Sequence, residues 1–175
     1  MKRVLIFCLI LLTSQTFAQN KQNADFVKYI NEYKDIAIKQ MREHSIPASI
    51  TLAQGLLESG AGNSELARRS NNHFGIKCGS SWKGKTVKHD DDRRNECFRV
   101  YKSVEESYKD HSLFLQKPRY QSLFKLDPLD YKSWARGLKA CGYATNPVYA
   151  NRLIDIIETY ELYMLDEDRQ GVTRR

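Results

Sequence analysis

The feature of this sequence best suited to chemistry is a carboxylate at the end of an apolar segment. Residues 46–62 read IPASITLAQGLLESGAG, and their apolar positions recur every three to four residues, which predicts a helix with an apolar face. Glu58 falls in the last turn, beside two leucines. The negative end of the helix and the apolar neighbours would both raise the pKa of its carboxyl group. A raised pKa suits a general acid near neutral pH, whereas a surface glutamate at a fraying helix end is the alternative.

Residues with strong positional preferences mark both ends of this helix. Ser45 is a plausible N-cap, and Pro47 fits the first turn, where a missing N–H group costs nothing. Gly60 and Gly62 supply the left-handed or extended turn that ends a helix. We therefore expect the helix to stop directly after Glu58.

The only convincing β-strand pattern in the sequence is a hairpin. Residues 86–87 and 97–100 are the predicted strands, and the polar residues 92–95 form the turn between them. The hairpin is inserted after the helix that carries Glu58.

An acidic run, HDDD, precedes the hairpin turn. In a strand, alternate residues share a face, so Val87, His89 and Asp91 would point one way. One interpretation is a solvated hairpin tip, and another is a second catalytic carboxylate that faces Glu58. A metal site is the third, but no second ligand cluster stands elsewhere in the sequence, so we expect no metal.

The other segments read mainly as helices. Ser103 and Glu106 have the spacing of a capping box, Asp130 is a suitable N-cap, and Pro147 suits the first position of the last helix after Thr145 or Asn146. The predicted helices span residues 23–43, 63 or 64 to 69, 103–115, 120–126, 130–140 and a segment that begins at 147. This pattern predicts a single α+β domain, mostly helical, with a small β-hairpin lobe.

The first residues predict export. Lys2 and Arg3 precede a short apolar run at residues 4–12, and Thr16-Phe17-Ala18 fits a small-x-small cleavage site. Residues 1–18 therefore read as a secretory signal peptide, with a retained N-terminal anchor as the alternative. The formal charge of +7 suits an anionic polymer such as a bacterial cell wall, although charge alone also allows nucleic acid or a membrane surface. The domain is expected over residues 23–165, and residues 166–175 form a charged, loose tail.

Three cysteines lie beyond the expected signal peptide: Cys78, Cys97 and Cys141. An oxidising compartment permits a disulfide, and three pairings are possible. Cys78 and Cys97 flank the predicted hairpin, so they are the expected pair. Cys141 follows a helix and is left over.

The remaining chemistry is that of an acid at a helix end opposite an acidic hairpin. The sequence shows neither a serine–histidine or cysteine–histidine pairing at a recognised nucleophile site nor a glycine-rich phosphate loop. Glycosidic bonds are cleaved by one carboxylic acid that protonates the leaving oxygen and a second carboxylate that activates water or stabilises positive charge.

Four blocks of the sequence resemble the family-73 glycoside hydrolases, which are exported bacterial peptidoglycan β-N-acetylglucosaminidases. The blocks are IPASITLAQGLLESGAGNSELA, NNHFGIK, FRVYKSVEESYKDH and GLKACGYATNPVYANRLIDIIE, in the order of the family. The resemblance covers about residues 26–165. It implies a lysozyme-like α+β fold and hydrolysis of the β-1,4 bond between N-acetylglucosamine and N-acetylmuramic acid.

The same resemblance implies roles for individual residues. The general acid of the family matches Glu58 in LLESGAG, and a cleft tyrosine matches Tyr143 in GYATNP. Phe74 and Gly75 match the floor of the cleft, and Asn72 in the same block is expected to bind substrate. His73 beside them is expected to be a hydrogen-bonded structural histidine, with substrate contact as the alternative.

One departure concerns the second carboxylate. Many members carry a glutamate in the hairpin, where this sequence has HDDDRRNE. Its only glutamate, Glu96, lies past the turn and is expected to face solvent. Strand alternation makes Asp91 the first choice for a catalytic carboxylate, and Asp90, the second choice, is expected to contact substrate.

The expected partner is therefore the peptidoglycan glycan strand, bound by a monomer that needs no cofactor. Neither nucleic acid nor stable membrane insertion is expected, and the expected location is the periplasm, cell envelope or exterior. Two rival functions remain open. A lytic transglycosylase would use the same acid to form an anhydro-sugar without water, and a non-catalytic wall-binding protein would keep the cleft for recognition only.

Overall fold

The computed structural model describes residues 22–91 and 93–168. The expected signal peptide, Asp92 and the last residues of the expected tail lie outside this part. The elements in chain order are α1 (Ala24–His44), α2 (Ala48–Ser59), α3 (Glu65–Ser70), β1 (Thr86–His89), β2 (Glu96–Arg99), α4 (Val104–Leu115), the 3-10 helix η1 (Pro118–Lys125), α5 (Tyr131–Ala140), α6 (Tyr149–Thr159) and the 3-10 helix η2 (Leu162–Glu167).

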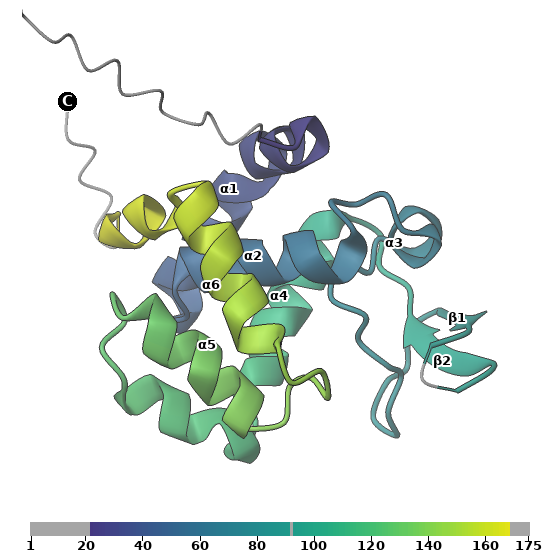
Figure 1. The fold of residues 1–175 in the computed structure, drawn as a ribbon. Coiled ribbons are helices and arrows are strands. Elements are labelled where there is room, and N and C mark those ends of the chain that lie inside the picture. Colours follow the sequence, from purple (N-terminus) through teal and green to yellow (C-terminus); the bar gives the residue numbers. More distant parts are fainter. Residues whose placement is uncertain (1–21, 92, 169–175) are drawn as a thin grey trace, which may run out of the picture.

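The helix α2 forms the centre of the fold (Figure 1). It packs against α1, α5, α6 and η2, and ten of its twelve residues are buried. A helix that is buried on all sides is a core helix, which replaces the single apolar face predicted from the sequence. Only Leu57, half-buried, and Glu58, exposed, escape this burial. The core therefore fixes the position of Glu58 through the rest of its helix.

The start of α2 differs from the prediction. Ser45 adopts a left-handed conformation (φ 59°) and ends α1, so it is not the N-cap of α2. Pro47 occupies the N-cap position without a side-chain hydrogen bond, just before the first turn. The first N–H groups of a helix have no partner within the helix. In α2 the carboxylate of Asp166 takes this role for Ser49, because it accepts from the Ser49 N–H group at 2.8 Å and from the Ser49 hydroxyl at 2.5 Å. Asp166 is fully buried, so the loose tail predicted to begin there is wrong at this residue.

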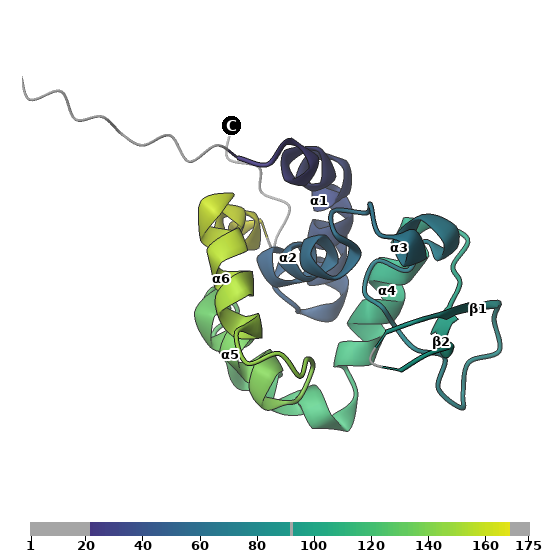
Figure 2. The same cartoon turned by 45° about the vertical axis from the view of Figure 1, so that its right-hand side comes forward.

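A hairpin lobe projects from the helical part on the side of α3, away from α5 and α6 (Figures 1 and 2). Strands β1 and β2 pair antiparallel, with Val87 opposite Phe98 and Lys88 opposite Cys97. A disulfide joins Cys78 to Cys97 and ties the preceding loop to β2, while Cys141 is a free, half-buried thiol. The predicted α+β class, mostly helical with one small hairpin, is confirmed.

Most other helix boundaries follow the side-chain caps of the sequence. Side chains of Asn23, Ser64, Ser103 and Asp130 cap α1, α3, α4 and α5. The predicted capping box at α4 is displaced, because Glu106 accepts from the Lys102 N–H group instead of that of Ser103.

The start of α6 was predicted two residues too early. Asn146 accepts from the Val148 N–H group at 3.0 Å in a local turn, and the helix begins at Tyr149 without a side-chain cap. Neither Thr145 nor Asn146 is therefore its N-cap, and Pro147 is not its first residue.

A close approach inside the core provides a stability test. A Cβ atom on Gly55 would lie 2.6 Å from the Tyr29 hydroxyl and 2.8 Å from the Tyr108 hydroxyl, and these two buried groups are hydrogen-bonded to each other at 2.9 Å. Gly55→Ala would normally favour a helix, but here we expect a loss of about 1–3 kcal/mol in unfolding free energy from overpacking. Urea unfolding measures it.

The matched control for this substitution is Gly137→Ala in α5. Its added Cβ would lie 2.5 Å from the end of the flexible Leu123 side chain and at an ordinary contact distance of 3.5 Å from that of Leu126. We expect a smaller loss, because a methyl group can rotate away whereas the tyrosine hydroxyls are fixed by their hydrogen bonds. Equal or greater stability in Gly55→Ala than in the unmodified protein would contradict the packing described here.

Candidate active site

A cleft of about 780 Å³ lies between the helical part and the hairpin lobe. Its volume falls within the range of roughly 300–1,000 Å³ that is typical of ligand sites. The walls come from the end of α2, residues 74–81, both strands, the end of α4 and the segment from 143 into α6. The residues in it that matter for chemistry are Glu58, Lys77, His89, Asp91, Tyr143, Tyr149 and Arg152.

Glu58 reaches this cleft from the last turn of α2. Gly60 follows in the left-handed conformation (φ 57°), and its N–H group bonds to the Leu56 carbonyl, which ends the helix as predicted. The carboxylate keeps contact with solvent, but the surrounding walls partly desolvate it. This desolvation raises the pKa of Glu58, and the negative charge of Asp91 adds to the increase.

Two residues of α6 act on Glu58 in the opposite direction. The Tyr149 hydroxyl hydrogen-bonds to the Glu58 carboxylate, and the positive charge of Arg152 also lowers the pKa of Glu58, although burial outweighs both. The Gln54 amide donates to the Tyr149 oxygen at 3.0 Å, so the hydroxyl proton is directed toward Glu58. Sequence reasoning missed Tyr149, whose only signal was its place in the apolar stripe of the last helix.

Asp91 lies in the turn two residues after His89, where β1 ends, and both residues line the cleft. Val87, predicted to share their face, does not line it. Its carboxylate is 3.2 Å from the ammonium group of Lys77. The negative charge of Asp91 contributes to the raised pKa of Glu58, so it acts on Glu58 across the cleft. The structure thus brings a second carboxylate to the same cavity as the first.

Two further acidic residues of the hairpin, Asp90 and Glu96, have structural partners. Asp90 accepts from the Asn95 N–H group at 2.7 Å and does not line the cleft, so it holds the turn and is not placed to contact substrate. Glu96, expected to face solvent, instead accepts from Lys77 at 2.8 Å and 2.9 Å, and Lys77 lowers its pKa. Lys77, which the sequence reasoning did not single out, therefore links the turn at Asp91 to the start of β2.

Aromatic rings form one wall and the floor of the cleft. Tyr143 stacks on Tyr149 with ring centroids 5.7 Å apart, and burial raises the pKa of Tyr143 well above its usual range. Phe74 is buried against His111, with centroids 3.9 Å apart. Gly75 lines the cleft with φ at 60°, and a Cβ there would meet no atom within 4 Å, so the space above it is open.

Two neighbouring residues lie away from the cleft. Asn72 is 1% exposed, and its side chain binds the backbone of Ile76 and Arg99, so the predicted substrate contact is replaced by a role in holding the turn. His73 is 4% exposed and its Nδ1 atom lies 2.8 Å from the Tyr29 hydroxyl, which fits the predicted structural histidine.

Within residues 22–91 and 93–168, no group of three or more His, Cys, Asp or Glu side chains has the arrangement of a metal site. Over the same ranges, each helix is too short or too polar to cross a lipid bilayer.

Comparison with known proteins adds family relationships to this geometry. A model of the family described as mannosyl-glycoprotein endo-beta-N-acetylglucosaminidase matches residues 34–162. Exo-glucosaminidase LytG of Bacillus subtilis is 39% identical over 138 residues, which cover 71% of this chain and 47% of LytG. Peptidoglycan hydrolase FlgJ of Vibrio parahaemolyticus is 32% identical over 161 residues, which cover 85% of this chain and 51% of FlgJ. The chain spans about half the length of these two relatives.

A solved structure shares the arrangement of the helices and the lobe. The crystal structure of a peptidoglycan hydrolase from Sphingomonas sp. A1 superimposes with a TM-score of 0.69 at 31% identity, covering 85% of this chain and 97% of the other. The fold is therefore lysozyme-like α+β, as the sequence resemblance implied.

Proposed function

Because the chain belongs to the glucosaminidase family, the family-73 glycoside hydrolases, we propose that it is a cell-wall hydrolase acting on peptidoglycan. The bond cleaved is the β-1,4 linkage between N-acetylglucosamine and N-acetylmuramic acid. The observation that carries the proposal is the position of Glu58. It is the exposed residue of a buried helix, its side chain lines the cleft, and its pKa is raised. The relatives named for this activity are longer than the matched segment, and the support for the activity of this chain comes from its own cleft.

In the proposed reaction, Glu58 is the general acid. Its protonated carboxyl group donates to the glycosidic oxygen, and the bond from the anomeric carbon to that oxygen breaks. The carboxylate of Asp91 stabilises the positive charge that develops on the sugar or removes a proton from the attacking water. The acetamido group of the substrate is an alternative source of that stabilisation.

The rest of the cleft would hold the sugar. The half-buried ring of Tyr143 supplies aromatic surface for a sugar ring, and Gly75 leaves space for the chain to approach the backbone. The Tyr149 hydroxyl positions the Glu58 carboxylate. Lys117 and Arg152 add positive charge to the same cavity, which suits a polymer that carries carboxylates.

Mass spectrometry of purified peptidoglycan digested by the mature protein tests the proposal. Fragments ending in reducing N-acetylglucosamine support it, and their sizes separate internal from terminal cleavage. Reducing N-acetylmuramic acid would mean a muramidase, and anhydro-muramic ends would mean a lytic transglycosylase. Binding to sacculi without any fragment would favour a wall-binding protein.

The charges around Glu58 predict a shift in the pH dependence of hydrolysis. A general acid works in its protonated form, so activity falls as pH rises through its pKa. Arg152 favours the ionised form, and Arg152→Gln removes that effect. The pKa of Glu58 then rises, and we expect the alkaline limb of the rate profile to move to higher pH.

The control for this pH shift is Lys117→Gln. Lys117 lines the same cleft but does not contribute to the pKa of Glu58. We expect the alkaline limb of the rate profile of Lys117→Gln to stay at the pH of the unmodified protein. A limb that moves to lower pH in Arg152→Gln would argue against Glu58 as the acid.

The same function requires export. Cleavage of residues 1–18 would release the domain to the periplasm, the cell envelope or the exterior, where the polymer lies. A monomer suffices for the proposed chemistry, because both carboxylates come from one chain.

A further inference from the structure

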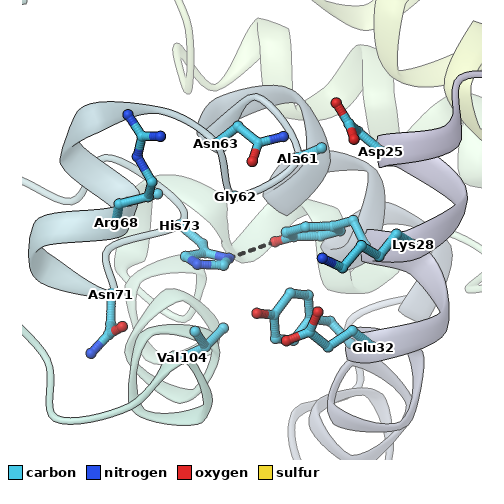
Figure 3. A pocket seen from close by; sticks show the side chains of 13 residues that line it. Asp25, Lys28, Glu32, Ala61, Gly62, Asn63, Arg68, Asn71, His73 and Val104 are labelled. Carbon is cyan, nitrogen blue, oxygen red and sulfur yellow. Dashed lines mark hydrogen bonds between the residues drawn. The ribbon is translucent and has the colours of Figure 1, made fainter.

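A second pocket, of about 290 Å³, opens between α1 and α3 (Figure 3). Residues of α1 form one wall, and residues 67–73 with Val104 form the other. The loop at residues 61–63 closes one side. None of its lining residues also lines the cleft that contains Glu58. The pocket is therefore a separate feature, divided from the cleft by the connection between α2 and α3.

A mostly buried histidine lines this pocket, and one of its ring nitrogens has no protein partner within the described residues. His73 is 4% exposed, and its Nδ1 atom bonds to the Tyr29 hydroxyl, which in turn bonds to Tyr108. Its Nε2 atom has no hydrogen-bond partner within the described residues. Burial lowers the pKa of His73 to about 4, so the ring is neutral at pH 7. Nε2 is not one of the fully buried atoms without a partner in the described part of the chain, so it is accessible from the pocket, where a ligand or water can bond to it.

Charges of both signs surround the mouth. Lys28 and Glu32 come from α1, with Asp25 one turn earlier, and Arg68 comes from α3 on the opposite side (Figure 3). No ion pair involves any of these four residues within the part of the chain that the structure describes. Cations and anions are thus both available to a ligand that carries both charges.

Of the two tyrosine rings that line the pocket, Tyr29 is covered and Tyr33 is half-buried, which leaves little aromatic surface for a sugar. Tyr29 is 2% exposed and packs between Tyr33 and His73, with centroids 4.6 Å and 5.5 Å away. Its face is therefore covered and offers no platform for a sugar ring. The volume lies near the lower end of the range for ligand sites, so a group of one or two residues fits.

We propose that this pocket binds a zwitterionic amino-acid or short-peptide group. Its carboxylate pairs with Lys28 or Arg68, its ammonium pairs with Glu32 or Asp25, and a polar atom of the ligand meets Nε2 of His73. Two sources share this chemistry: a stem peptide of the cell wall and a free peptide. The first source rests on the proposed function, because a glycan strand bound in the cleft could extend its peptide branch over residues 61–64 into this pocket.

The experiment titrates the mature protein with meso-diaminopimelate, glycylglycine and a chitin trisaccharide, followed by nitrogen NMR of the His73 ring. We expect saturable shifts of Nε2 with the first two ligands and none with the trisaccharide. Tighter binding of the diaminopimelate probe assigns the site to the wall peptide, and equal binding assigns it to free peptides. No shift with either zwitterion overturns the proposal, and the pocket then holds only water.

Substitutions in α1 locate the charges. Lys28→Ala should weaken binding about fivefold, as expected for loss of one exposed ion pair. Lys34→Ala is the matched control, because Lys34 lies in the same helix outside the pocket. The affinity of this variant for the zwitterions should not change. Glu32→Gln should weaken the zwitterions but not N-acetylalanine, which lacks the ammonium group. Equal affinities in all three variants would contradict the assignment. These affinities do not depend on hydrolysis, so the proposal and the enzymatic function can fail separately.

Discussion

Replacing Glu58 by glutamine is expected to lower the rate of peptidoglycan hydrolysis by about three orders of magnitude. General acid catalysis contributes roughly 10²–10⁴-fold, and glutamine has the size of glutamate without a proton to donate. The side chain lies at the surface of a helix whose other residues are packed in the core, so the fold should be unchanged. Release of reducing ends from sacculi, measured with circular dichroism on the same samples, tests this result.

The stability of the same variant provides an independent check. The folded-state pKa of Glu58 is raised above its unfolded value, so its contribution to stability is present below the unfolded pKa and is lost as pH rises through the folded pKa. Glu58→Gln should therefore be at least as stable as the unmodified protein at pH 7, and the difference should vanish in acid. An active Glu58→Gln enzyme would refute the assignment of the acid, and a variant less stable at pH 7 would refute the desolvation of its carboxyl group.

Local rules were enough to predict where Glu58 lies. The apolar spacing and the two glycines fixed the end of α2 one residue after it, and a left-handed Gly60 is what the structure has. Alternation likewise predicted that Asp91 and His89 share a side, and both line the cleft, although Asp91 lies in the turn beyond β1. Both patterns act within a few residues, and a single sequence contains them in full.

Contacts between segments that are distant in the sequence could not be predicted from such local patterns. The acceptor for the first turn of α2 is Asp166, 117 residues from Ser49, so a local cap was assigned in its place. The Tyr149 hydroxyl reaches Glu58 only because α6 packs against α2. Asn72 was assigned to substrate from its motif, although its amide is used by the backbone of Ile76 and Arg99. Polar side chains with long-range partners are thus the ones that sequence reasoning misassigned.

The second large effect is expected at Asp91. Asp91→Asn keeps the size of the side chain but removes the charge proposed to stabilise the developing cation or to activate water, and we expect hydrolysis to fall about 100-fold. Lys77 keeps its bonds to Glu96, so the hairpin should hold its shape. The lost negative charge also lowers the pKa of Glu58, and the alkaline limb of the rate profile should move to lower pH, opposite to the shift in Arg152→Gln.

Asp90→Asn is the matched control for Asp91. The asparagine oxygen can still accept from the Asn95 N–H group, and the side chain lies outside the cleft, so activity should stay close to that of the unmodified protein. A larger loss at Asp90 than at Asp91 would mean that the hairpin closes over substrate in another register. Full activity in Asp91→Asn, with Glu58→Gln inactive, would transfer the stabilising role to the acetamido group of the substrate. The pair of variants therefore separates a mechanism with two protein carboxylates from one with Glu58 alone.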